Sequence, residues 1–120
     1  MIQVFGTNKC KGTKAAERFF AERGLKIQRI DLASKGMAKG ELERVAKAVG
    51  GIVALLDREG ARAKAKGLHV LSVDQERVKQ MLLDDALLLR TPIVARGSVA
   101  AVGADEATWK RLAEAEKQGA

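Results

Sequence analysis

The sequence is poor in aromatic residues and has a single cysteine, and both shortages limit the structures that it can form. Aromatic residues make up 3% of the 120 residues, so a core must be built from Ala, Val, Leu and Ile. Cys10 is the only cysteine, which excludes an intramolecular disulfide and, with a single histidine, leaves no convincing zinc site. No segment reaches the ~18 apolar residues of a membrane span. The N-terminus also lacks the basic start and long apolar run of a signal peptide. We therefore expect one domain, residues 1–120, in the reducing cytoplasm and without a membrane partner.

Basic residues exceed acidic ones, 22 against 15, which gives a net charge of +7. This excess permits anionic partners such as acidic proteins, phosphate-like anions or anionic thiols. Nucleic-acid binding usually adds a recognisable motif or stacking aromatic residues to the charge. Here Phe19 and Phe20 have the spacing of core residues, so we expect no direct contact with nucleic acid.

The first third of the chain predicts a βαβ unit. Residues 2–5 are β-rich and end at Gly6, residues 11–23 have helical apolar spacing, and residues 25–32 alternate apolar and polar positions with one slip at Gln28-Arg29. Two strands joined by a helix within about thirty residues are expected to lie parallel, with a right-handed crossover.

The middle of the chain is predicted to be helical. An apolar stripe runs through residues 42–49, and residues 52–56 form a further short apolar helix. Residues 58–67 are interpreted as a basic, low-complexity segment. Ser72 and Gln75 then form a capping box before a helix with Val78, Met81 and Leu82 on one face, and residues 84–89 make one more short helical turn.

The last third predicts a β-hairpin and a helix. Pro92, the only proline, opens an apolar run at 93–96, and Gly97-Ser98 separates it from a second run at 99–102. This pattern is typical of a hairpin with a type II′ turn. Trp109, Leu112 and Ala113 share one face of the final helix, where Trp109 is predicted to pack against the sheet. The whole order predicts an α/β fold with a four-stranded mixed sheet.

Four segments in this order resemble the arsenate reductase (ArsC) and Spx family of thioredoxin-like fold. They are the opening strand and thiol loop at 2–10, the start of a helix at 39–42, the Leu-Leu-Asp-Arg-Glu-Gly motif at 55–60 with Lys66-Gly67-Leu68, and Leu-Leu-Arg-Thr-Pro-Ile-Val at 88–94. The resemblance covers nearly the whole chain. It implies a thioredoxin-like domain with a helical insert, and a cis peptide bond between Thr91 and Pro92 that lies against the thiol.

The chain departs from the family pattern at the residues that hold the oxyanion. Arsenate reductases of this type use three arginines, and the aligned positions here are Val53, Thr91 and Gly103. A guanidinium is the planar group that binds an oxyanion with two hydrogen bonds, so arsenate turnover is expected to be weak or absent. The Cys-x-x-Cys switch of Spx-type regulators is also missing, because Thr13 stands where the second cysteine would be.

Cys10 is the candidate nucleophile. A thiol at a helix N-terminus meets unpaired N–H groups and the positive end of the helix dipole, which favour the thiolate. The flanking Lys9 and Lys11 are expected to act in the same direction, and the Thr13 hydroxyl lies one turn away. A buried structural cysteine is the alternative, but the surrounding Asn-Lys-Cys-Lys-Gly segment is polar.

The predicted site therefore consists of Cys10 and the residues expected to stabilise its thiolate or a bound anion: Lys11, Gly12, Thr13, Arg90, Thr91 and Pro92. Arg58, Arg62 and Arg96 are further cations, for which a solvated surface role is expected. His69 is interpreted as a partly buried packing residue.

Three hypotheses of function follow from the resemblance, of which the third is a degenerate family member with neither of the two activities described next. In the first, the protein is a monothiol oxidoreductase: Cys10 attacks a small oxidant or a disulfide, and external glutathione or a glutaredoxin resolves the adduct, with no bound cofactor. In the second, it is an Spx-like module that binds RNA polymerase without turnover.

Overall fold

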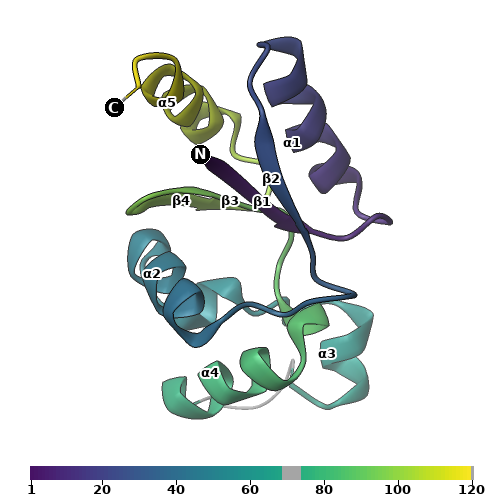
Figure 1. The fold of residues 1–120 in the computed structure, drawn as a ribbon. Coiled ribbons are helices and arrows are strands. Elements are labelled where there is room, and N and C mark those ends of the chain that lie inside the picture. The colour runs from purple at the N-terminus through teal and green to yellow at the C-terminus, as the bar shows by residue number, and fades with distance from the viewer. Residues whose placement is uncertain (69–73, 120) are drawn as a thin grey trace.

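A four-stranded mixed sheet forms the centre of the molecule (Figure 1), which is described from a computed structural model covering residues 1–68 and 74–119. The strand order is β2-β1-β3-β4. The first two strands pair in parallel and the last two are antiparallel to their neighbours. The strands are β1 (Ile2–Gly6), β2 (Ile27–Asp31), β3 (Ile93–Arg96) and β4 (Val99–Val102).

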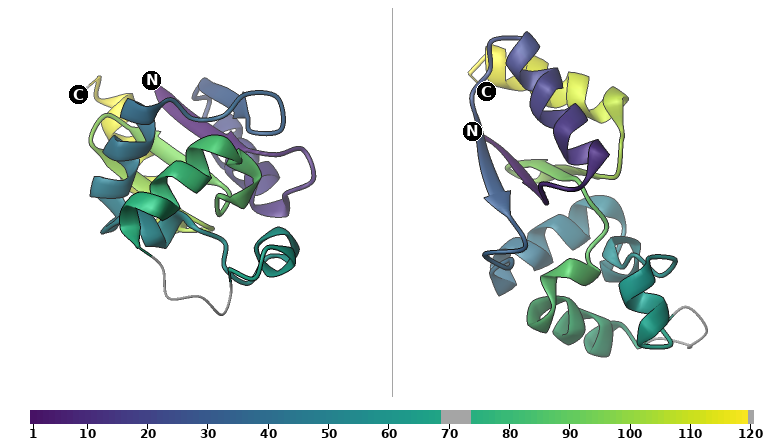
Figure 2. Two further views of the ribbon diagram at one scale, coloured as in Figure 1. Left: turned by 90° about the horizontal axis from the view of Figure 1, so that it is seen from below. Right: turned by 90° about the vertical axis from the view of Figure 1, so that its right-hand side faces the viewer.

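Helices cover both faces of this sheet, as the views in Figure 1 and Figure 2 agree. One face carries α1 (Lys11–Glu22) and α5 (Glu106–Lys117). The other face carries the helical insert: α2 (Lys39–Val49), the 3₁₀ turn η1 (Ile52–Leu55), α3 (Ala61–Ala65), α4 (Gln75–Asp84) and the 3₁₀ turn η2 (Ala86–Leu88).

Alternation along the strands creates two separate apolar cores. Ile2 and Val4 of β1 contribute to the core beneath α1 and α5, which also contains Trp109. Phe5 turns to the opposite face and joins the core beneath the helical insert. Because successive side chains of a strand alternate between faces, a shift of one residue would exchange these two sets, so the two cores fix the register of β1.

Most of the predicted elements are confirmed, including the hairpin about Gly97, which has a positive φ of 59°. Trp109 is 1% exposed and packs edge-on to Phe19, with ring centroids 5.6 Å apart. The second strand starts later than predicted, at Ile27, because the N–H group of Leu25 still bonds to the Phe20 carbonyl at the end of α1.

Two predictions for the helical insert need correction. The segment interpreted as basic and of low complexity contains helix α3, whose Ala63 is 1% exposed in the core. The alanines of this segment favour a helix. The burial of one of them, Ala63, was not evident from the sequence because charged residues surround it. Helix α4 begins at Gln75 after an N-cap at Asp74, so the predicted capping box, with Ser72 as the N-cap and Gln75 as the third helical residue, is wrong. Ser72 itself and the packing role of His69 lie outside the described residues.

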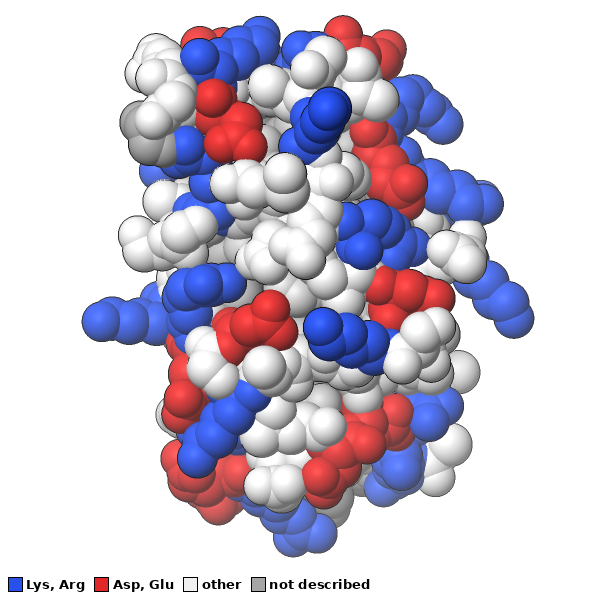
Figure 3. All heavy atoms as spheres, in the orientation of Figure 1, with Lys and Arg blue, Asp and Glu red and all other residues white. Residues whose placement is uncertain are grey.

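The surface carries both signs of charge. On the face that Figure 3 shows, Lys and Arg side chains are interleaved with Asp and Glu side chains instead of forming a field of one sign. Within residues 1–68 and 74–119, no helix is both long and apolar enough to cross a membrane.

Candidate active site around Cys10

Cys10 lies where the first strand passes into the first helix. Strand β1 ends at Gly6, and the N–H group of Cys10 closes a turn by donating to the Thr7 carbonyl at 3.2 Å. Cys10 is the N-cap residue of α1 and has extended backbone angles. Its side chain makes no capping hydrogen bond to the first turn of the helix. The thiol is half-buried. The sulfur therefore remains available at the N-terminus of a twelve-residue helix.

The proline loop supplies a hydrogen bond to this sulfur. The Thr91 hydroxyl donates to Cys10 Sγ at 3.1 Å, although 81 residues separate the two in sequence. The peptide bond between Thr91 and Pro92 is cis, as the resemblance implied. A hydrogen bond donated to a thiolate stabilises the charged form more than the neutral one, so this contact favours ionisation of Cys10.

The surroundings of the sulfur lower the pKa of Cys10. Burial by itself would raise that pKa, but the hydroxyls of Thr13 and Thr91 and the N–H groups of Thr13 and Gly12 act against it and prevail. Of these four groups, Thr91 has the geometry of a formed hydrogen bond; the others act on the sulfur as nearby dipoles. Lys9 and Lys11 flank the thiol and are exposed, and their expected effect on it stays a prediction.

Thr13 is the one buried polar residue of the described core, and its hydroxyl oxygen has no hydrogen-bond partner among the described residues. It packs against Gly6 so closely that a Cβ atom at Gly6 would overlap the Thr13 side chain. An unpaired buried hydroxyl costs free energy. When Cys10 ionises, the Thr13 hydroxyl gains a charged acceptor nearby, and this recovers part of that cost.

Gly12 permits the approach of the proline loop. A Cβ atom built on Gly12 would lie 2.8 Å from Pro92 Cδ and 3.7 Å from Cys10 Sγ. The first distance is too short for two carbon atoms, and the second is an ordinary contact. Helix α1 and the proline ring therefore meet at this position only because the side chain is a hydrogen atom.

Arg29, on the edge strand β2, holds the thiol loop from the other side. Its guanidinium donates to the Gly6 carbonyl at 3.2 Å, the Asn8 Oδ1 atom at 3.2 Å and the Glu17 carboxylate at 3.0 Å. These contacts join the end of β1, the loop before Cys10 and helix α1. Arg29 and Gly6 were not predicted as site residues. The only available signal was the slip in the alternation of the second strand at Gln28-Arg29.

Arg90 does not contact the sulfur in the structure. Its guanidinium donates to the Ala54 carbonyl at 3.3 Å, and its second terminal nitrogen lies 3.4 Å from the position that a Cβ atom of Gly103 would occupy. The side chain thus lies beside Gly103, one of the positions at which the resemblance places an arginine, and bonds to the residue that follows another, Val53. Two other predicted surface cations are paired with carboxylates, Arg62 with Asp85 and Arg96 with Glu116.

A cavity of about 320 Å³ borders the loop immediately before Cys10. Thr7, Asn8 and Lys9 line this cavity together with the exposed, apolar side chain of Leu87. No group of three or more His, Cys, Asp or Glu side chains within the described ranges is placed to hold a metal ion.

The site thus combines a thiol at a helix N-terminus with a cis-proline loop, as the family resemblance implied, and comparison of the sequence with known families supports that resemblance. The sequence pattern of the ArsC family matches residues 5–112. The chain belongs to the ArsC family. No curated protein sequence matches it.

Solved structures of other ArsC-related proteins share the fold at low identity. An ArsC-family related protein from Bacteroides fragilis superposes with a TM-score of 0.84 at 15% identity, over 92% of this chain and 96% of that one. An arsenate reductase from Vibrio cholerae gives a TM-score of 0.75 at 16% identity, over 84% and 87%. At such identities the likeness establishes the thioredoxin-like fold. The predicted fold class is therefore confirmed.

Proposed function

We propose that this ArsC-family protein is a thiol-dependent oxidoreductase in which Cys10 is the only redox-active group. The observation that carries the proposal is the 3.1 Å hydrogen bond from Thr91 to Cys10 Sγ at the N-terminus of α1, together with the lowered pKa of this thiol. A thiolate attacks disulfides and other oxidised centres, whereas the protonated thiol does not.

The proposed cycle has two exchange steps. The Cys10 thiolate attacks one sulfur of a disulfide substrate, forms a mixed disulfide and releases the other sulfur as a thiolate. Glutathione, or the thiol of a glutaredoxin, then attacks the substrate sulfur of that mixed disulfide and releases the Cys10 thiolate. An external thiol is required because the chain has no second cysteine. A second external thiol then attacks the glutathione or glutaredoxin sulfur of the mixed disulfide just formed, which releases the remaining substrate thiol and leaves the two external thiols joined as a disulfide. The two electrons therefore come from two thiols outside the protein.

The site favours some oxidised substrates over others. The cavity beside Thr7, Asn8 and Lys9 offers room for the non-reacting part of a disulfide or of a small-molecule oxidant. Arsenate is a weaker candidate, because Val53, Thr91 and Gly103 stand where the resemblance places the three oxyanion-binding arginines. Arg90 is the cation nearest in sequence to the proline loop and is the residue proposed to attract an anionic substrate or thiol.

The proposal includes a reducing compartment, and we place the protein in the cytoplasm on that ground. A solitary reactive thiol persists there in the reduced state required for attack. In an oxidising compartment Cys10 would be held in mixed disulfides, and no residue of the chain would release it.

The test measures the rate of Cys10 alkylation by iodoacetamide between pH 5 and 10, and the reduction of hydroxyethyl disulfide by glutathione. We expect a midpoint below that of free cysteine and protein-dependent disulfide reduction. Cys10→Ser is expected to abolish turnover and the glutathione adduct while leaving the thermal unfolding curve unchanged.

Two results would contradict the proposal. A midpoint at or above that of free cysteine would assign Cys10 a packing role. If the alkylation midpoint lay below that of free cysteine but no disulfide were reduced, and if purified RNA polymerase bound tightly, the Spx-like regulatory role would be supported instead.

A further inference from the structure

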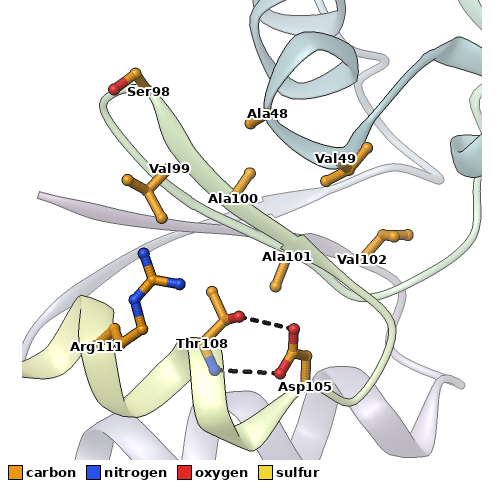
Figure 4. A pocket seen from close by; sticks show the side chains of 10 residues that line it. All are labelled: Ala48, Val49, Ser98, Val99, Ala100, Ala101, Val102, Asp105, Thr108 and Arg111. Atoms are coloured by element: carbon orange, nitrogen blue, oxygen red, sulfur yellow. Dashed lines mark hydrogen bonds between the residues drawn. The ribbon is translucent and has the colours of Figure 1, made fainter.

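A groove runs along the free edge of the sheet, away from Cys10. It encloses about 460 Å³ between the C-terminal end of α2, the whole length of β4 and the first turns of α5. Figure 4 shows its lining, with Ala48 and Val49 on one side of β4 and Thr108 and Arg111 on the other. Because it straddles the sheet edge between two helices, the groove has the position that an added strand would take.

The backbone of β4 presents unpaired groups to this groove. Strand β4 is last in the sheet order, and no described strand pairs with its outer side. In the antiparallel ladder to β3, Arg96 pairs with Val99 across the two-residue turn, and the Gly103 N–H group donates to the Pro92 carbonyl. Hydrogen-bonding residues alternate in such a ladder. Ala100 and Val102 therefore direct their N–H and C=O groups outward.

The usual protections of an edge strand are missing here. Proteins blunt free edges with lysine, proline or a bulge, whereas β4 consists of Val99, Ala100, Ala101 and Val102 in regular register. Val99 is 36% exposed. The small side chains of Ala48, Ala100 and Ser98 also leave the strand accessible from the groove.

Charge at the groove favours an acidic occupant. Arg111 is exposed, points from α5 toward β4 in Figure 4, and forms no hydrogen bond or ion pair within the described part of the chain. The Asp105 carboxylate in the same groove accepts from the N–H and hydroxyl groups of Thr108 at 3.1 and 2.7 Å. The charge of Arg111 helps to lower the pKa of Asp105, but the two side chains form no direct ion pair, so the guanidinium retains donors for a further carboxylate. A second cavity, of about 250 Å³, shares Val99 and Arg111 and extends the groove along α5.

From these observations we infer that the β4 edge is a docking site for an extended, acidic segment of another protein, which adds to the sheet as a fifth strand. Main-chain hydrogen bonds to Ala100 and Val102 would hold the segment, and an acidic side chain would pair with Arg111. A second copy of this chain is a poorer fit. Two-fold pairing of β4 with itself would place Arg111 of both copies on the same face of one continuous sheet, and each copy carries a net charge of +7.

The experiment selects peptides from a displayed library of random nine-residue sequences on the immobilised full-length protein. The enriched peptides are expected to alternate apolar and acidic residues. The most enriched peptide is then titrated into ¹⁵N-labelled protein, and we expect the amide resonances of Ala100 and Val102 to move more than those of Val99 and Ala101. Arg111→Glu should weaken binding about tenfold, whereas Lys110→Glu, an equal charge change at an exposed neighbouring position, should change it less than twofold.

A proline substitution tests the main-chain contribution separately. Ala100→Pro removes an outward N–H group and leaves the ladder to β3 intact, so it should abolish binding; if it unfolds the protein, the comparison of Arg111→Glu with Lys110→Glu decides. The inference is overturned if no peptide is enriched, if the amides of β4 do not move, or if Lys110→Glu weakens binding as much as Arg111→Glu. It is also overturned if dilution alone moves the β4 resonances, because a second copy would then be the occupant.

Discussion

Replacing Gly12 by alanine is expected to destabilise the protein and to reduce the reactivity of Cys10 at neutral pH. The new methyl group would lie 2.8 Å from Pro92 Cδ. The proline ring belongs to a loop that continues directly into the buried strand β3, so it cannot yield without moving the strand or the helix. Forcing an extra carbon into such a packed contact costs about 1–3 kcal/mol.

A second effect acts in the opposite direction. Alanine within a helix is more favourable than glycine by about 0.5–1 kcal/mol, because glycine loses more backbone freedom on folding. The steric cost exceeds this gain at Gly12, so the free energy of unfolding should fall by about 1 kcal/mol, or about 4 °C in Tm. Displacement of the loop should also lengthen the hydrogen bond from Thr91, which is 3.1 Å in the native protein, and thereby raise the pKa of Cys10.

Gly40 provides a matched control. It occupies the second position of α2, as Gly12 does of α1, and a Cβ atom at Gly40 would meet no atom within 4 Å. Gly40→Ala should therefore stabilise the protein by up to about 1 kcal/mol and leave the alkylation profile unchanged. Urea unfolding and iodoacetamide alkylation against pH measure both quantities. If the two variants changed stability in the same direction, or if Gly12→Ala kept the native alkylation midpoint, the assignment of Gly12 to loop positioning would be wrong.

Three further predictions concern the site and the helical insert. Thr91→Val removes the donor to Cys10 Sγ at nearly constant volume, so the alkylation midpoint should move to higher pH while the rate of the fully ionised thiol changes little; an unmoved midpoint would contradict the role of this bond. Asp85→Asn should cost about 1 kcal/mol at pH 7, because the hydrogen bond from Arg62 lowers the pKa of Asp85 from its ordinary value of 3.8. That stabilisation is present above the ordinary pKa and is lost as the pH falls, so urea midpoints of the variant and wild type should converge below pH 4. Arsenate reduction with glutathione and glutaredoxin should be weak, since each missing guanidinium contact removes about 1.5–3 kcal/mol; robust, saturable turnover that Arg90→Ala abolishes would show that Arg90 replaces them.

The sequence allowed prediction of those features that depend on local pattern. The strands, the hairpin at Gly97 and the position of Cys10 before a helix follow from residue types that are neighbours in the chain. The placement of Pro92 against the thiol came from the family resemblance, because no local pattern relates positions that are more than eighty residues apart.

The contacts that complete the site could not be predicted in this way. The close approach of Gly6 to Thr13 and the direction of the Arg90 side chain depend on how separate elements pack, which the residue types alone do not determine. Helix α3 was missed for a related reason: the burial of Ala63 in the core, which the surrounding charges conceal in the sequence, depends on packing against other elements.

The contacts of Arg29 have a consequence for the energetics of the reaction. A loop residue loses about 1–2 kcal/mol of backbone conformational entropy when it becomes fixed. The residues before Cys10 lose that freedom during folding, because one guanidinium joins the Gly6 carbonyl, Asn8 and Glu17. In the proposed reaction, an incoming disulfide would therefore meet a loop that is already ordered. If Cys10 reacts as proposed, Arg29 of the edge strand β2 would contribute to the rate of attack by preorganising the loop that carries the nucleophile.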